Sequence, residues 1–132
     1  MARTNVFLGG GNSAPGFTSA DFFGVGGLGT ETVTFGTGSA AADTTVDQNV
    51  EGVVFGGIDD DYRFQQQGNQ LRVYVGATLI TTITVQDDAN GTQLTFANGT
   101  VNAKVSALGM TLGTGTVPAA APAAVETGLV PP

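Results

Sequence analysis

The sequence contains no cysteine and no histidine among its 132 residues. The absence of cysteine excludes disulfides and thiolate metal sites. The absence of histidine removes the commonest general base and the commonest ligand of transition metals. A serine or threonine nucleophile would have to rely on the only lysine, Lys104. The residue inventory therefore predicts a protein that is not an enzyme.

Positive charge is also scarce, with 4 Lys and Arg residues against 11 Asp and Glu residues and a net charge of -7. Binding nucleic acid requires clustered basic residues to neutralise phosphates, so we expect no nucleic-acid partner. Anionic membrane surfaces are disfavoured for the same reason. No stretch approaches the roughly 20 apolar residues of a membrane span, so no membrane insertion is expected. Met1–Leu8 lacks the apolar region of a cleaved signal peptide.

Glycine is abundant, with 21 residues, and threonine is frequent while strong helix formers are few. Glycine favours tight turns, and β-branched threonine favours strands. With 41% hydrophobic residues the chain can bury a core. These features predict an all-β protein.

An internal repeat with a spacing of 20 residues lies in the first half of the chain. Glu31-Thr-Val-Thr-Phe-Gly-Thr-Gly38 aligns with Glu51-Gly-Val-Val-Phe-Gly-Gly-Ile58. At strand period, Val33 and Phe35 would point inward and Thr32 and Thr34 outward. The repeat predicts either short stacked β-rungs or a sandwich. The alternative is two unrelated strands of similar composition.

The second half of the chain reads as a series of short strands joined by glycine turns. Strands are expected at residues 62–66, 70–75, 78–85, 92–96, 100–105 and 110–112. Turns are expected at Gly68, at Gly76 and at two Asn-Gly pairs, Asn90-Gly91 and Asn98-Gly99. The stacked region should therefore lead into one antiparallel β-meander.

Composition divides the chain into three parts. Residues 1–29 form a Gly-rich N-terminal arm, residues 30–117 a β domain, and residues 118–132 an extended tail rich in Ala and Pro. The prolines exclude the tail from a central strand or a stable helix. We expect extended termini that are free or docked on a neighbouring subunit.

Acidic residues cluster in and beside the predicted turns. Flexible turns with carboxylate and carbonyl oxygens suit Ca²⁺, which takes six to eight oxygen ligands. A cation would also offset the repulsion between neighbouring carboxylates. The alternative is a set of solvated acidic loops, because Asp also favours turns. The candidate calcium ligands are Glu31, Asp47, Glu51, Asp59, Asp60, Asp61, Asp87, Asp88 and Asn90.

Three segments carry a resemblance to a group of bacterial proteins. They are Val46-Asp-Gln-Asn-Val-Glu-Gly-Val-Val-Phe-Gly-Gly57, Asp61-Tyr-Arg-Phe-Gln-Gln-Gln-Gly-Asn-Gln-Leu-Arg-Val-Tyr74 and the stretch Ile83–Val101. The pattern resembles modules of large extracellular calcium-associated repeat proteins, adhesins and surface-layer-like proteins exported by type I secretion. The resemblance covers roughly residues 30–117. It implies leaderless export, folding outside the cell with Ca²⁺, and a structural role.

Two functions remain open at this point. The first is a structural subunit that assembles with copies of itself into an extracellular filament, sheath or surface layer, through β-strand or terminal-arm contacts. The second is an adhesin or a carbohydrate-binding β module that recognises a cell-surface glycan. The second function requires an exposed aromatic platform, for which Tyr62 and Tyr74 are the candidates because the Phe residues read as core.

Overall fold

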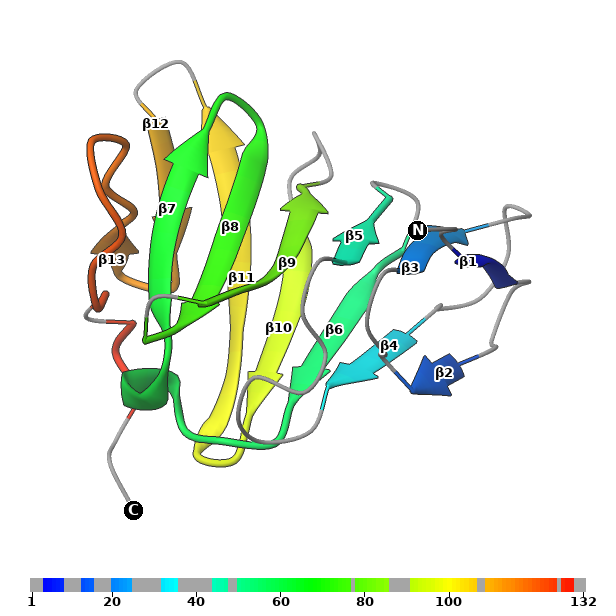
Figure 1. Ribbon diagram of the computed structural model, residues 1–132. Coiled ribbons are helices and arrows are strands. Elements are labelled where there is room, and N and C mark those ends of the chain that lie inside the picture. Colours follow the sequence, from blue (N-terminus) through cyan, green and yellow to red (C-terminus); the bar gives the residue numbers. More distant parts are fainter. Residues whose placement is uncertain are drawn as a thin grey trace.

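The fold is all-β, with two mixed sheets packed face to face (Figure 1). The computed structural model describes only part of the chain, and its first three segments are described as strands without side chains. The described residues are 4–8, 13–15, 20–24, 32–35, 44–47, 50–76, 78–85, 91–106, 109–125 and 127–129. Within these residues no α-helix is present, and no helix is long and apolar enough to cross a membrane.

The two sheets are named sheet A and sheet B. Sheet A has the order β1 (Thr4–Leu8), β3 (Ala20–Gly24), β5 (Thr44–Val46), β9 (Thr78–Thr84), β8 (Gln70–Val75) and β7 (Arg63–Gln67). Sheet B has the order β13 (Gly115–Thr116), β12 (Gly109–Leu112), β11 (Gly99–Ser106), β10 (Thr92–Phe96), β6 (Gly52–Phe55), β4 (Thr32–Phe35) and β2 (Ser13–Pro15).

The first half of the fold is a parallel stack. The chain alternates between the sheets, so that β1, β3, β5 and β9 pair in parallel in sheet A while β2, β4, β6 and β10 do so in sheet B. Each pair of consecutive strands therefore forms one rung of a stack (Figure 1). The predicted all-β fold is confirmed as a sandwich-like pair of sheets, within which the parallel strands stack in rungs that begin before the repeat, because β1 and β3 also belong to sheet A.

The 20-residue repeat is the register of this stack. Val33 pairs with Val53, and Phe35 pairs with Phe55. Val33 and Phe35 are buried and Thr34 is exposed, as the strand period predicts. A third copy of the repeat, Thr92-Gln-Leu-Thr-Phe-Ala-Asn-Gly99, continues the ladder, because Leu94 pairs with Val53.

Two antiparallel meanders extend the stack at its other end. In sheet A the chain runs β7, β8, β9, and in sheet B it runs β10, β11, β12, β13. The prediction of one continuous meander is wrong, because β9 and β10 lie in different sheets. Asn90-Gly91 therefore precedes a strand of the opposite sheet rather than closing a hairpin. The turns at Gly68 and Asn98-Gly99 do close hairpins.

Gly91 has a close-approach role in this arrangement. Its φ is +65°, and a Cβ there would lie 1.9 Å from the Ala103 carbonyl oxygen. Only glycine satisfies both conditions without moving the backbone of β11.

The core lies between the sheets and is aromatic at its centre. Phe55 stacks on Phe35 at a centroid distance of 5.6 Å and on Phe96 at 5.3 Å. Tyr62 and Phe64 pack against Phe96 at 5.6 Å and 6.1 Å. These five rings are at most 3% exposed. The Phe residues among them are confirmed as core, whereas Tyr62 is not an exposed platform.

The C-terminal tail covers the β7 edge of sheet A (Figure 1). Phe64 and Ala123 exchange backbone hydrogen bonds of 2.8 and 3.1 Å, and the Gln66 N–H donates to the Pro118 carbonyl at 2.7 Å. Val117 and Val125 are buried in the core. The described part of the tail is therefore docked on its own chain.

Candidate functional site

The acidic turn predicted at Asp59–Asp61 forms a 3-10 helix, η1 (Asp59–Asp61), between β6 and β7. Its first residue is buried, with Asp59 only 4% exposed, whereas Asp60 and Asp61 are exposed. The three carboxylates of this run therefore occupy different environments.

Both carboxylate oxygens of Asp59 accept hydrogen bonds from side chains distant in sequence. Asn98 Nδ2 donates to Oδ1 at 2.9 Å, and Thr127 Oγ1 donates to Oδ2. The Asp59 backbone N–H donates in return to Asn98 Oδ1 at 3.3 Å. Thr127 Oγ1 also accepts the Leu129 N–H at 3.2 Å. We call this group the Asp59 clamp, and it joins η1, the β10–β11 turn and the tail.

Asp61 lies beside the buried phenol of Tyr62. A Cβ on Gly57 would lie 2.8 Å from Asp61 Oδ2 and 3.1 Å from the Tyr62 hydroxyl, so both groups gather around this glycine. The Gly57 N–H donates to the Tyr62 hydroxyl at 3.1 Å. Burial raises the pKa of Tyr62 above 10.0, the Asp61 charge raises it further, and the Gly57 hydrogen bond opposes the shift.

The remaining candidate calcium ligands are dispersed or lie outside the described residues. Asp47 follows β5 of sheet A, while Glu51 precedes β6 of sheet B, and both are half-buried. Within the described part of the chain, no three acidic side chains gather as metal ligands would. The candidates outside the described residues are Glu31, Asp87, Asp88 and Asn90.

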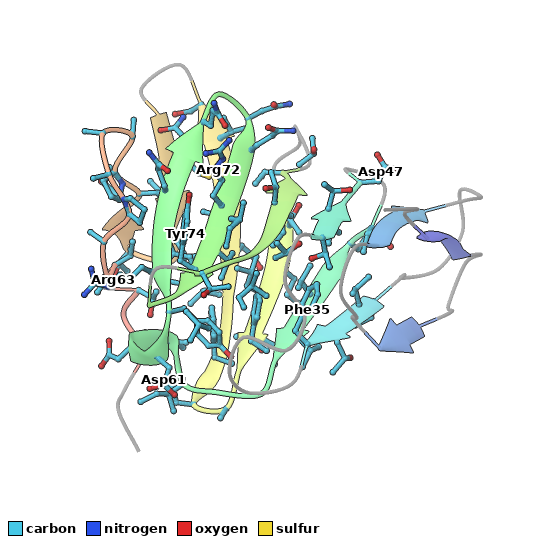
Figure 2. All side chains as sticks on the ribbon, in the orientation of Figure 1. Phe35, Asp47, Asp61, Arg63, Arg72 and Tyr74 are labelled. Carbon is cyan, nitrogen blue, oxygen red and sulfur yellow. The ribbon has the colours of Figure 1, made fainter. Side chains whose placement is uncertain are left out.

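A second feature lies on the outer face of sheet A, where sequence reasoning had identified only Tyr74. In the β7–β8 ladder Arg63 pairs with Tyr74, and Gln65 pairs with Arg72. Leu71 and Val73 of the same strand are buried, so Arg72 and Tyr74 face outward. Figure 2 shows Arg72, Tyr74 and Arg63 distributed along the β7–β8 hairpin. Strand alternation thus places two of the four basic residues of the chain around one tyrosine.

Hydrogen bonds hold this face in place. The Tyr74 hydroxyl donates to Gln65 Oε1 at 3.3 Å, and Gln65 Nε2 donates to the Ala119 carbonyl at 3.0 Å. Beside Tyr74 lies an open hollow of about 500 Å³, whose described lining is Arg63, Tyr74, Gly76 and Pro122. The tail therefore forms one wall of this hollow.

The two ends of the fold differ in whether another described segment covers the edge strand. At one end β7 is covered by the tail, as described above. At the other end β1 and β2 are the outermost described strands of their sheets. Strand β2 has three residues and ends in Pro15, a residue that limits pairing at edges, whereas β1 has five residues and no proline.

Comparison with family models, with curated proteins and with solved structures finds no match to this chain.

Proposed function

We propose that this protein is a structural subunit outside the bacterial cell, which associates with copies of itself into a filament, sheath or surface layer. The observation that carries the proposal is the difference between the two ends of the stack. A tail covers the β7 edge, while β1 ends the described part of sheet A with five residues free of proline. An edge strand carries backbone N–H and C=O groups that a strand of another copy can pair with.

Pairing of two β1 edges related by a two-fold axis closes on itself and yields a pair of subunits. Extension into a layer or filament needs a second contact. The outer face of sheet B suits that role because its exposed residues are mostly uncharged. They include Gln93, Thr100 and Thr111, with Lys104 among them. Uncharged surface is buried at lower desolvation cost than charged surface.

Calcium is part of this proposal as a stabilising ligand rather than as a catalytic one. Within η1, Asp60 and Asp61 are exposed residues, while the carboxylate of Asp59 is held in the clamp. A ligand that binds the folded state alone raises its stability, and the gain grows with the ratio of free ligand concentration to the dissociation constant. A melting temperature that rises with CaCl₂ and not with an equal concentration of MgCl₂ would support the calcium role. Identical melting in CaCl₂ and in EDTA would remove calcium from the proposal.

The absence of cysteine makes the β1 contact directly testable. Single cysteines are introduced at each of residues 4–8, with Asp60→Cys as an exposed control away from β1. If copies pair through β1, at least one of the strand variants forms a disulfide-linked dimer under mild oxidation, well above the control. If none of the five exceeds the control, the β1 contact is wrong.

A further inference from the structure

The outer face of sheet A carries a second feature that is independent of self-association. Arg63 lies opposite Tyr74 in the ladder, and Arg72 lies two residues from Tyr74 on the same face of β8. Side chains opposite each other in an antiparallel ladder lie roughly 5 Å apart at Cβ, and those two apart along a strand lie roughly 7 Å apart. Arg63 and Arg72 are therefore both neighbours of Tyr74 on the outer face of sheet A, one across the ladder and one along β8.

Neither guanidinium is held by a partner in the part of the chain that the structure describes. Among the described residues, Arg63 and Arg72 make no ion pair and no side-chain hydrogen bond, and Arg72 Nε is buried without a partner. The Oδ2 atom of the neighbouring Asp61 lies beside Gly57. Two unpaired cations on one face are unexpected in a chain with a net charge of -7.

The hollow beside Arg63 and Tyr74 is large enough for a sugar ring. It measures about 500 Å³, lies open to solvent, and has Gly76 and Pro122 in its lining. Tyr74 is fixed by its hydrogen bond to Gln65, so its ring is held in place before any ligand arrives. A pre-ordered aromatic ring reduces the entropy lost on binding.

From these observations we infer that Arg63, Arg72 and Tyr74 form a binding site for a carboxylate-bearing saccharide. The sugar ring packs on Tyr74 in the hollow, and its carboxylate accepts hydrogen bonds from a guanidinium, whose planar fork matches a carboxylate. A neutral sugar would leave both guanidiniums unpaired. An acidic peptide without aromatic or sugar rings would satisfy the charges but would not pack a ring against Tyr74.

The test measures binding of trigalacturonate to the full chain by isothermal titration calorimetry at low salt. Maltotriose serves as the neutral sugar and triglutamate as the acidic peptide. The expected result is that trigalacturonate binds most tightly of the three and that the affinity falls as NaCl is added. Arg63→Gln and Arg72→Gln should each weaken binding about tenfold or more, since each removes a charge-assisted hydrogen bond.

Lys104→Gln is the matched control, because it removes one positive charge from the exposed face of sheet B. It should leave the affinity within about twofold, which separates the site from an effect of net charge alone. The inference is overturned if trigalacturonate does not bind, if maltotriose or triglutamate binds as tightly, or if Lys104→Gln weakens binding as much as the arginine variants do. Each variant is checked for a wild-type melting temperature before it is titrated.

Discussion

Phe35 and Phe55 are separated by 20 residues in the sequence, yet they are partners on adjacent parallel strands, and their rings stack at 5.6 Å. Phe96 extends the same ladder on the other side of Phe55 at 5.3 Å. The three rungs that supply these rings are thus locked in register by like side chains. One buried ring, Phe55, contacts both of its neighbours.

Removing the central ring should destabilise the fold strongly. We expect Phe55→Ala to lower the free energy of unfolding by about 3–5 kcal/mol, because it deletes a fully buried aromatic side chain and leaves a cavity. Phe55→Leu keeps most of the volume and should cost about half as much or less. Urea denaturation measures both values. Equal losses for Ala and Leu would show that ring stacking, rather than filled volume, dominates at this position.

The repeat predicted this stacking correctly, but only two of its copies could be recognised by spacing. The third copy follows at 41 residues, because β7 and β8 are inserted between β6 and β9. The same insertion explains why a hairpin was wrongly predicted at Asn90-Gly91. A local turn signal cannot show that the next strand pairs with residues about 40 positions earlier, since that choice depends on long-range packing.

A second pair of similar strand sequences in the stack could not be recognised by spacing for the same reason. Thr44-Thr45-Val46 of β5 pairs in register with Thr81-Thr82-Ile83 of β9. Thr44 and Thr81 are both buried, but only Thr44 has a hydrogen-bond acceptor, the Ile80 carbonyl at 2.7 Å. The Thr81 hydroxyl has no partner among the described residues.

These two threonines make a matched pair of substitutions. Thr44→Val should destabilise the fold by about 1 kcal/mol, because a buried hydrogen bond is lost. Thr81→Val replaces an unpaired buried hydroxyl with a methyl group and should be neutral or stabilising by up to about 1 kcal/mol. Thermal unfolding of the two variants side by side measures the difference. A loss at Thr81 as large as that at Thr44 would indicate that the Thr81 hydroxyl has a partner after all.

The Asp59 clamp should hold the tail against the body of the fold. Thr127→Val leaves Asp59 Oδ2 without its donor, so we expect a loss of about 1–3 kcal/mol. The loss should be concentrated in the tail, and amide exchange should accelerate at Thr114 and Phe64, whose N–H groups bond to Thr127 and Ala123. Asp60→Asn on the exposed side of η1 is the control and should change stability by at most about 0.5 kcal/mol. Unchanged amide exchange in Thr127→Val would contradict the clamp.

Sequence reasoning located the acidic run of η1, but it could not show that the three carboxylates lie in different environments. Turn preference and charge repulsion apply equally to Asp59, Asp60 and Asp61. Their roles separate only because η1 directs Asp59 toward Asn98 and Thr127, which lie 39 and 68 residues away. The placement of Arg63 and Arg72 beside Tyr74 could not be predicted for a related reason. Arg63 and Arg72 come near each other only through the β7–β8 register. The sequence alone indicated only that Tyr74 could be an exposed aromatic residue.

Tyr62 should make stability sensitive to alkaline pH. Its pKa is raised in the folded state, mainly by burial, while in the unfolded chain it is about 10. The folded state therefore keeps the phenol proton at a pH where the unfolded chain has lost it. This contribution to stability is fully present below about pH 10 and is lost as the pH rises from there through the folded pKa.

Tyr62→Phe is the corresponding test. At pH 8 it should cost about 1–3 kcal/mol, because the Gly57 N–H loses its acceptor. Above pH 10 its stability should fall less steeply than that of the wild type, so the two curves converge. Parallel curves for Tyr62→Phe and the wild type would show that Tyr62 does not control the alkaline limb.

The central claim, association of copies through the β1 edge, is tested most directly by sedimentation of the wild type beside two proline variants, Asn5→Pro and Val6→Pro. Successive N–H groups of a strand point to opposite sides, so one proline removes a bond to β3 and the other removes a donor from the open edge. We predict that the wild-type sedimentation coefficient rises with concentration, in CaCl₂ or without it. The proline variant that keeps the wild-type melting temperature should remain monomeric. A wild type that stays monomeric at high concentration in CaCl₂ would contradict the claim. Two proline variants that both fold and both assemble like the wild type would contradict it as well.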